Sequence, residues 1–233
     1  MSPLSIPVIF EDENFLIINK PSALVVHPFD NSNEETLVDL LNVSHPDIFT
    51  ITDNAFTLQN GTVVPLGGIV HKLDRETSGV MVIAKNQSTF AELKKAFLEH
   101  TTKKVYLALI GGNIETGSLR INAPLGRNKK SYKQVAFPEN PRGELREAVT
   151  DLTVVLRGTS VTMVKLEPIT GRTHQLRAHM THIGHPIVGD RAYGSTVESP
   201  RIMLHAQKLT FILNNKEHSF EAPAPKEFIE PFE

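Results

Sequence analysis

The sequence predicts an α+β fold built on a largely antiparallel, mixed sheet with flanking helices and loops. Three observations lead to this class. Short apolar runs typical of strands outnumber the stretches with helical spacing. Most of these runs follow one another in hairpin order, separated by turn residues. No pattern repeats at a fixed period, and 233 residues are enough to bury a core in one or two units.

The N-terminal elements are a hairpin and a short helix. Residues 7–21 are predicted to form the hairpin, because two apolar runs flank an acidic turn and Pro21 ends the second run. A helix is expected over 36–41, where the leucines share one face. Residues 42–68 are mostly polar without a clear period, so we expect them to be mostly loop.

The next segments predict a strand, a helix and a strand. The apolar run 80–85 is typical of a buried strand. Residues 88–98 give the clearest helical pattern, with apolar side chains on one face and Ser88 able to cap the start. The run 104–110 alternates weakly and ends at two glycines, which indicates another strand.

The C-terminal half is predicted to be strand-rich. Residues 122–146 are rich in Lys, Arg, Asn, Gly and Pro, which indicates a long exposed hairpin or loop, and such loops are often functional. A strand pair is expected over 151–156 and 160–167. A short helix then covers 173–182, and 208–213 forms a late strand.

Composition and charge narrow the class of protein. The chain has no cysteine, which excludes disulfides and thiolate metal sites. It has no apolar run of membrane-spanning length and no secretion signal, so we expect a cytoplasmic protein. The net charge of −2 is unevenly distributed: residues 1–60 sum to −8, and residues 61–215 sum to +9. The central part is therefore expected to carry a basic surface, although solvated lysines account for part of the excess.

The segment 71–79, HKLDRETSG, is the most informative in the chain. It places Asp74 between Lys72 and Arg75, on a polar turn directly before the predicted strand at 80–85. Neighbouring cations favour the ionised carboxylate, which suits a nucleophile or an anion stabiliser. The alternative is that Asp74 caps a turn by accepting backbone N–H bonds. From these residues alone, both interpretations stay open.

A second constellation covers residues 168–179. Arg172 and Arg177 bracket a histidine and a glutamine, just after a predicted strand and a glycine turn. Backbone N–H groups and guanidinium groups there are typical of an anion-binding corner. Arg177 could instead be the buried partner of a carboxylate. The two interpretations agree if that carboxylate is Asp74.

A histidine series raises the question of a metal site. Imidazoles three residues apart on a helix can share an ion, but no Asp or Glu lies within the series, and Gly184 and Pro186 interrupt the helix. We therefore expect no metal and treat these histidines as solvated or capping. The series is His174, His179, His182 and His185.

Tyr106 is a candidate stacking surface for a base. It stands between Lys103–Lys104 and an apolar run, in a chain with three tyrosines and no tryptophan. The alternative is an ordinary core aromatic with a satisfied hydroxyl group.

Together these motifs resemble the RluA-type pseudouridine synthases, which isomerise uridine in structured RNA to its C–C glycoside. The two signature segments of that family are similar to HKLDRETSG at 71–79 and GRTHQLRAH at 171–179. Similarity extends from about residue 9 to 223, with further matches at 17–22, 104–108 and 184–190. The resemblance implies the pseudouridine synthase catalytic fold as a single domain over 1–233. It also implies that no separate N-terminal RNA-binding domain of the S4 type is present.

The resemblance also implies catalytic roles. Asp74 falls on the catalytic aspartate, and Tyr106 on the tyrosine that stacks on the uracil and takes part in proton transfer. Arg177 is the first choice for the arginine that pairs with the aspartate, and Arg172 is the second. Lys72 departs from the usual arginine that fills the gap left by the flipped base, since lysine lacks the planar guanidinium.

The implied substrate is structured RNA, either tRNA or rRNA. Flipping a uridine out of its stack costs a few kcal/mol, which phosphate contacts can offset. Since the isomerisation has no net redox change, we expect no cofactor, and we expect a monomer with no membrane and no obligatory protein partner. Arg120, just before the long loop, is a further phosphate-binding candidate. The expected RNA-binding residues are His71, Lys72, Arg75, Thr77, Arg127, Lys129, Lys130, Lys133, Arg172 and His174.

Two other functions stay open at this point. One is a catalytically silent RNA-binding or chaperone protein on the same fold, and the other is a histidine-based metallohydrolase. The presence of Asp74, Tyr106 and Arg177 together favours the enzyme, because a silent protein has little need of all three.

Overall fold

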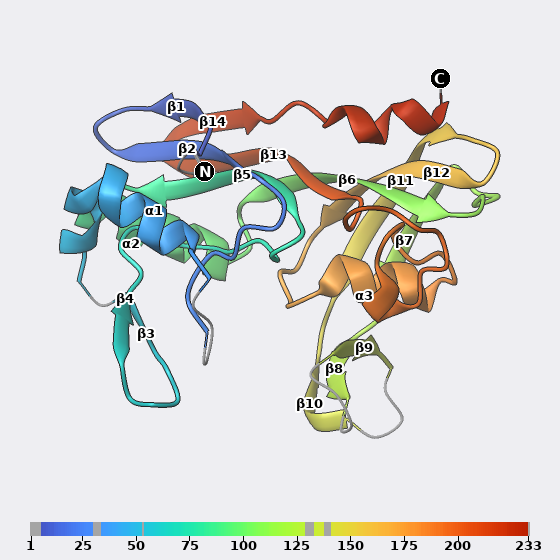
Figure 1. Ribbon diagram of the computed structural model, residues 1–233, viewed down its shortest axis with the longest axis horizontal. Coiled ribbons are helices and arrows are strands. Elements are labelled where there is room, and N and C mark those ends of the chain that lie inside the picture. The colour runs from blue at the N-terminus through green and yellow to red at the C-terminus, as the bar shows by residue number, and fades with distance from the viewer. Residues whose placement is uncertain (1–5, 30–33, 53, 129–132, 138–140, 233) are drawn as a thin grey trace. The chain divides into compact units, whose positions relative to one another are not determined.

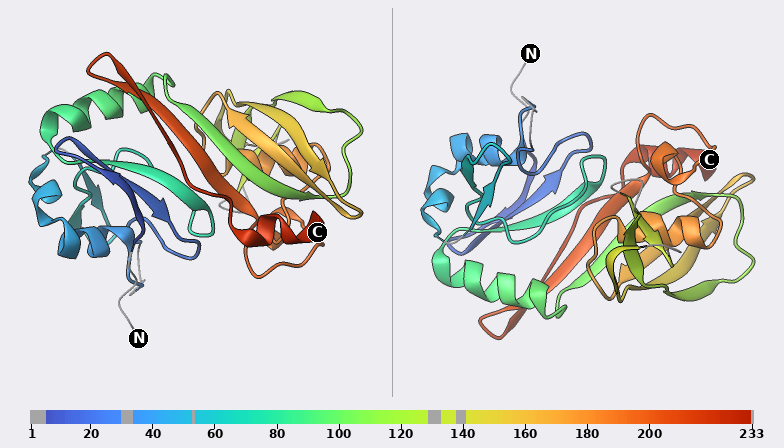
Figure 2. Two further views of the ribbon diagram at one scale, coloured as in Figure 1. Left: turned by 90° about the horizontal axis from the view of Figure 1, so that it is seen from above. Right: turned by 90° about the horizontal axis from the view of Figure 1, so that it is seen from below.

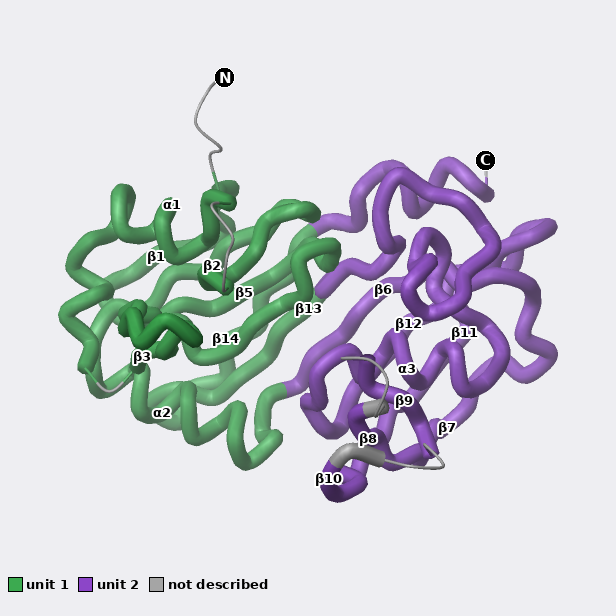
Figure 3. Tube along the Cα trace, turned by 60° about the horizontal axis from the view of Figure 1, so that its bottom comes forward, with its two compact units in different colours: residues 1–102, 208–222 green, residues 103–207, 223–233 purple. Residues whose placement is uncertain are grey.

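The computed structural model describes residues 6–29, 34–52, 54–128, 133–137 and 141–232 (Figure 1). By contacts the chain divides into two compact units (Figure 3). Unit 1 contains residues 1–102 and 208–222, and unit 2 contains residues 103–207 and 223–233. The α+β class is confirmed, because strands outnumber helices and the described pairings β1–β2, β2–β5, β13–β14, β6–β12, β12–β11 and β11–β7 are all antiparallel.

Unit 1 contains a largely antiparallel sheet with the predicted N-terminal hairpin at one end. The turn of that hairpin is held by Asp12, whose Oδ1 accepts from the backbone N–H groups of Asn14 and Phe15 at 2.8 Å each. The β5 strand is buried along its whole length, as its unbroken apolar run predicts. The strands of this unit are β1 (Val8–Glu11), β2 (Phe15–Lys20), β5 (Ser78–Ala84), the part of β13 (Leu204–Leu213) from Lys208 onward, and β14 (Lys216–Glu221).

Two α-helices accompany this sheet, both close to their predicted positions. The α1 helix (Leu37–Ser44) begins with a capping box, in which Thr36 and Asp39 satisfy each other's backbone N–H groups. The α2 helix (Gln87–Leu98) is capped by Asn86, whose Oδ1 accepts from the backbone N of Thr89 at 2.9 Å. The prediction that Ser88 caps this helix is therefore wrong, because the helix begins at Gln87 and Asn86 occupies the N-cap position.

The prediction of mostly loop over 42–68 missed a short hairpin. Strands β3 (Ala55–Thr57) and β4 (Val63–Pro65) pair there, after a 3-10 turn at Pro46–Thr50. Each strand has three residues and is largely exposed, so neither shows the alternation that marks a half-buried strand. The β14 strand, with the sequence KEHSFE, is also largely exposed and was not predicted.

Unit 2 contains a second antiparallel run of strands in the order β6-β12-β11-β7 (Figure 2). The α3 helix (Gln175–His182) packs on this sheet, where Leu176 and Met180 enter the main core of the unit. The expected strand pair over 151–167 and the helix at 173–182 are confirmed. The strands are β6 (Lys103–Gly111), β7 (Ser118–Asn122), β11 (Val149–Arg157) and β12 (Val161–Pro168).

Residues 122–146 form more than the predicted exposed hairpin or loop. Strands β8 (Leu125–Asn128), β9 (Gln134–Ala136) and β10 (Pro141–Arg146) make a three-stranded sheet in the order β10-β8-β9. This outer sheet is anchored by Leu125, which packs against Ala178 of α3 and Tyr193. Three 3-10 turns follow α3 in this unit, at Arg191–Tyr193, Lys226–Phe228 and Glu230–Phe232. Among the helices described, none is long and apolar enough to cross a membrane.

Candidate active site and nucleic-acid interface

Asp74 lies on a tight turn at the entrance to β5, as the sequence predicts. The backbone N of Thr77 donates to the carbonyl of Asp74 at 3.1 Å, which closes the turn. The Asp74 side chain is half-buried, while Lys72 and Arg75 on either side are exposed. Gly79 has φ 120°, a backbone conformation that favours glycine, so the chain can bend directly into the strand.

A buried lysine stabilises this turn through hydrogen bonds to backbone carbonyl groups. Lys20 is 0% exposed at the end of β2, and its Nζ donates to the carbonyls of Pro21 and Leu24 at 2.8 Å and of Arg75 at 3.1 Å. Ser22 adds a hydrogen bond from its Oγ to the carbonyl of Glu76 at 2.8 Å. The segment 20–24 therefore holds the backbone on the C-terminal side of Asp74. No role was predicted for Lys20, although a lysine at the end of an apolar strand could have indicated one.

His71 supports the other side of the turn. Its Nε2 accepts from the backbone N of Val82 at 3.1 Å, and its ring stacks on Phe97 with centroids 4.4 Å apart. Thr77 is buried, which suits it to shaping the turn. Arg75 forms ion pairs with Glu34 at 3.2 Å and with Glu76 at 3.8 Å, so part of its charge is already compensated.

In unit 2, Tyr106 lies on β6, opposite Leu166 of β12. Its ring is half-buried and packs at the edge of the main core, so it combines features of both predicted alternatives. Lys104 stands two residues earlier on the same face of the strand. Burial lowers the pKa of Lys104 from its ordinary value. The side of β6 with Tyr106 therefore also carries a partly desolvated cation.

Arg177 forms a buried, two-point ion pair. Its Nε donates to Asp190 Oδ2 at 2.7 Å, and its Nη2 donates to Asp190 Oδ1 at 3.0 Å. The guanidinium also lies over the ring of Tyr193, with its carbon 4.7 Å from the centroid. Because a guanidinium is planar, fixing two of its nitrogens also fixes the direction of Nη1. No role was predicted for Asp190 or Tyr193, which lie 13 and 16 residues further along the chain.

The hydroxyl group of Tyr193 links α3 to the outer sheet. It lies 3.0 Å from His174 Nδ1, accepts from the backbone N of Gln134 at 3.2 Å, and donates to the carbonyl of Gln134 at 3.1 Å. His174 itself has φ 53° and begins α3. This hydroxyl group thus joins β9 to the segment 171–179 that the sequence singled out.

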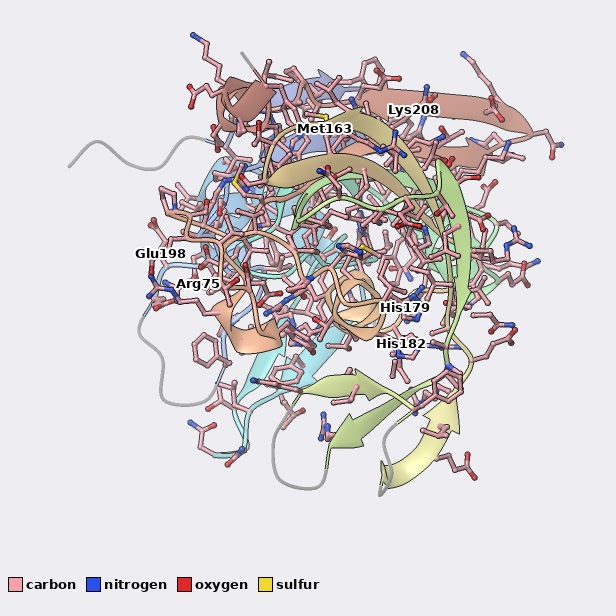
Figure 4. All side chains as sticks on the ribbon, turned by 90° about the vertical axis from the view of Figure 1, so that its right-hand side faces the viewer. Arg75, Met163, His179, His182, Glu198 and Lys208 are labelled. Atoms are coloured by element: carbon pink, nitrogen blue, oxygen red, sulfur yellow. The ribbon has the colours of Figure 1, made fainter. Side chains whose placement is uncertain are left out.

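The four histidines of the series have separate partners. His179 is buried, with Nδ1 2.9 Å from Thr150 Oγ1 and Nε2 3.0 Å from the carbonyl of Ala123. His185 Nδ1 lies 2.9 Å from the carbonyl of Gly111. His179 and His182 both belong to α3 (Figure 4). Within the described ranges, no group of three or more His, Asp or Glu side chains is arranged to hold a metal ion.

A cleft of about 570 Å³ opens between the outer sheet and the turn before α3. Three arginines line it, and we call it the arginine cleft after them: Arg127 of β8, Arg146 of β10 and Arg172 of the turn. Arg127 and Arg172 were predicted to bind RNA, and the structure brings them together. Arg146 and Glu144, which also line the cleft, were missed. Both lie in the last three residues of the basic stretch 122–146, a position that could have indicated them as candidates.

Two of the remaining basic residues that were predicted to contact RNA, Lys133 and Arg120, contact other parts of the protein. Lys133 donates to the carbonyl of Ala192 and lies 6.0 Å from the ring centroid of Tyr193, so it packs on the protein. Arg120 forms two hydrogen bonds with Asp151, at 2.6 and 2.7 Å, and these lower the pKa of the Asp151 carboxyl group. Lys129 and Lys130 lie outside the described residues.

Comparison with known proteins points to one family. Residues 14–182 match the family model described as RNA pseudouridylate synthase. The chain is 35% identical over 231 residues to an uncharacterized RNA pseudouridine synthase of Mycoplasma pneumoniae, which covers 95% of this chain and 67% of that protein. It is 33% identical over 232 residues to the ribosomal large subunit pseudouridine synthase D of Borreliella burgdorferi, with coverages of 98% and 68%. The solved structure of human RNA pseudouridylate synthase domain containing 1 matches with a TM-score of 0.76 and 27% identity, over 96% of this chain and 86% of that chain.

Proposed function

This chain belongs to the RNA pseudouridylate synthase family, and we propose that it isomerises particular uridines of structured ribosomal or transfer RNA. The family consists of isomerases that act on RNA. Ribosomal RNA is the first candidate substrate, because a relative with 33% identity that covers 98% of this chain is a ribosomal large subunit pseudouridine synthase. This similarity is the observation that carries the proposal.

Asp74 is the proposed catalytic carboxylate. The reaction breaks the bond from ribose C1′ to uracil N1 and forms a bond from C1′ to C5. The C5 proton leaves, and N1 gains a proton, so atoms and electrons balance without an added reactant. Asp74 suits this role because its turn is braced by Lys20, Ser22 and His71, which limits its motion. Either attack on the substrate or proton removal by Asp74 is compatible with an ionised carboxylate.

Tyr106 and Arg177 are the other proposed catalytic residues, on the strength of their positions in the family motifs. Tyr106 offers a half-buried aromatic face on which a uracil can stack. Arg177 supplies a fixed positive charge, since Asp190 holds two of its nitrogens. Lys72 is exposed beside Asp74 and carries the charge, though not the planar group, needed to fill the gap left by a flipped base.

Binding energy for base flipping comes, in this proposal, from contacts to the RNA backbone. Extrusion of a uridine costs a few kcal/mol. The arginine cleft offers guanidinium groups that can bind phosphate with two parallel hydrogen bonds each. We further propose that residues 1–233 act as one catalytic domain. The protein is then a cytoplasmic monomer that needs no protein partner and no cofactor.

The decisive experiment is the substitution Asp74→Asn. Tritium release from RNA containing 5-tritiated uridine should fall to background, because the amide can neither attack nor accept a proton. Binding of the same RNA should stay within a few fold of the wild type. Asp47→Asn, at an exposed position in the 3-10 turn 46–50, is the matched control and should keep full activity.

Two results would overturn the proposal. Turnover retained by Asp74→Asn would exclude the carboxylate mechanism. No tritium release by the wild type from any ribosomal or transfer RNA would favour a silent RNA-binding protein. If the wild type is active and Asp74→Asn is not, pseudouridine mapping in total RNA from a deletion strain and its parent would identify the modified position.

A further inference from the structure

The arginine cleft lies entirely within unit 2, and none of Asp74, Tyr106 and Arg177 lines it. We propose that this cleft is a second nucleotide subsite, which binds one unpaired nucleotide of the substrate RNA other than the uridine that is isomerised. The phosphates of that nucleotide contact the three arginines, and an amino group on its base donates to Glu144. This inference rests on the proposed function, because it assumes an RNA substrate.

The three arginines of the cleft, Arg127, Arg146 and Arg172, form no ion pair within the part of the chain that the structure describes. Whereas Arg157 of the same unit donates to backbone carbonyls, four other arginines of the unit each face a carboxylate: Arg120, Arg177, Arg191 and Arg201. Three guanidinium groups and one carboxylate, Glu144, line this concavity, so its net charge is positive and attracts phosphate.

Strand register explains why the cations converge. Arg127 of β8 pairs with Gln134 of β9, and Arg146 of β10 pairs with Leu125 of β8. Directly opposite residues point to the same face of a sheet, and so do residues two apart on a strand. Arg127 and Arg146 therefore share the face of the outer sheet that carries Leu125.

The opposite wall is the turn before α3. Arg172 donates from its Nε to the carbonyl of Glu147 at 3.1 Å, and its backbone N donates to Gln175 Oε1 at 3.0 Å. Gln175 is buried and also bonds to Thr170 and to the backbone of Val149. The turn is thus rigid, and the two terminal nitrogens of Arg172 are not used by any hydrogen bond within the described ranges.

Glu144 distinguishes a nucleotide from a bare phosphate. It lies two residues before Arg146 on β10, lines the same cleft, and forms no ion pair with a described residue. A carboxylate repels phosphate, so it weakens a site meant only for the RNA backbone. It accepts well from an exocyclic amino group, as carboxylates do from cytosine N4. Three cations with one acceptor therefore fit a phosphate together with an amino-bearing base.

The size of the cleft favours a single unpaired nucleotide. Its volume of about 570 Å³ lies within the usual range for small-ligand sites. In an RNA duplex, one amino hydrogen of cytosine donates to the partner base, and the other lies in the deep, narrow major groove, which side chains cannot read. An unpaired cytidine leaves that group available. Uridine carries a carbonyl at the same position, which faces Glu144 unfavourably.

The test compares two oligonucleotides that differ in this group. Affinities for fluorescently labelled hexamers of cytidylate and of uridylate are measured by anisotropy at several salt concentrations. Arg146→Gln should weaken both, and should reduce the slope of log affinity against log salt by about 0.7 for each phosphate that the variant no longer neutralises. Glu144→Ala should weaken the cytidylate hexamer about tenfold, as expected for one hydrogen bond to a charged group, and should not weaken the uridylate hexamer.

Lys226→Gln is the matched control, because it removes an exposed cation of unit 2 that does not line the cleft. It should leave both affinities unchanged, and thermal unfolding should show that all variants are folded. If Glu144→Ala raises the affinity for both hexamers equally, the cleft binds only phosphate, and the proposal of a nucleotide subsite is wrong. If Arg146→Gln changes neither affinity nor slope, no RNA enters the cleft. Since binding needs no turnover, these outcomes are independent of the Asp74→Asn result.

Discussion

The buried pair of Arg177 and Asp190 allows a quantitative test of how unit 2 holds a catalytic candidate in place. Asp190 is 1% exposed and Arg177 is 8% exposed. Asp190 Oδ1 also accepts from the backbone N of Tyr193 at 3.2 Å. Asp190→Asn preserves the shape of the side chain but removes its charge. It also replaces one acceptor oxygen by an NH₂ group that faces donors.

The expected loss of stability is large. Removing one partner of a buried ion pair costs about 3–5 kcal/mol. Because asparagine keeps one carbonyl oxygen, we expect about 3 kcal/mol, at the lower end of that range. For a chain of this length, each kcal/mol lowers Tm by about 2–4 °C, so Tm should fall by about 6–12 °C.

Glu221→Gln provides the comparison. The ion pair between Lys208 and Glu221 has the same 2.7 Å separation, but its side chains are 40% and 59% exposed. Solvent screening limits such a pair to less than about 1 kcal/mol, or at most about 4 °C in Tm. The two substitutions therefore share the carboxylate-to-amide change and the distance, and differ in burial.

Thermal unfolding of both variants, followed by circular dichroism at neutral pH, measures the difference. Turnover at a temperature where Asp190→Asn is fully folded gives a second readout. If Asp190 positions Arg177, kcat should fall while the affinity for RNA changes little. Equal Tm shifts for the two variants would refute the reasoning from burial, and an unchanged kcat would show that Asp190 acts on stability alone.

Two further predictions concern a buried histidine and a close backbone contact. Burial, reinforced by His182, holds the pKa of His179 below its ordinary value of 6.5, so the unfolded chain binds a proton there that the folded protein does not. The free energy of unfolding should therefore fall as the pH drops through 6.5. Urea unfolding at pH 5–7 should show that His179→Asn flattens this pH dependence. An unchanged slope of unfolding free energy against pH would contradict the prediction. Gly68→Ala should cost at least about 3 kcal/mol, since an added Cβ would lie 1.8 Å from the carbonyl oxygen of Ala84. Gly117→Ala, where no atom lies within 4 Å, should stay within about 0.5 kcal/mol, and similar urea midpoints for the two would count against the steric explanation.

The sequence predicted best those elements whose burial leaves a pattern. The β5 strand is buried on both faces, and its continuous apolar run identified it. The α2 helix showed apolar side chains on one face, which predicted its extent within one residue at the N-terminal end. The strands β3 and β4 are short and largely exposed, so burial imposes no period on them, and β14 buries only His218 and Phe220 in part, so all three sequences resemble loops.

Candidate site residues could be named from the sequence where they lie in a contiguous motif. Asp74 stood out within 71–79, and Arg172 and Arg177 within 171–179. Partners supplied by distant segments were not predictable, because they depend on register and packing. Arg146 joins Arg172 only because β10 pairs with β8 next to the turn before α3. Lys20 reaches Arg75 across 55 residues of sequence.

Unit 1 is built from two segments that are far apart in the sequence, and this has a consequence for synthesis on the ribosome. This unit combines residues 1–102 with residues 208–222. The core of the unit includes Phe211, whose ring lies edge-on to that of Phe15 at 5.4 Å between centroids. At about 5–20 residues per second, translation of the roughly 100 intervening residues takes about 5–20 s.

During this interval the nascent chain carries the first strands of unit 1 without the strand that completes their core. Apolar side chains of β2 and β5 that later contact Phe211 and Leu209 are then accessible to other chains. Such exposure is a recognised cause of aggregation during synthesis. The folding yield in a cell should therefore depend on how quickly the ribosome reaches residue 222, and on chaperones that cover this surface until then.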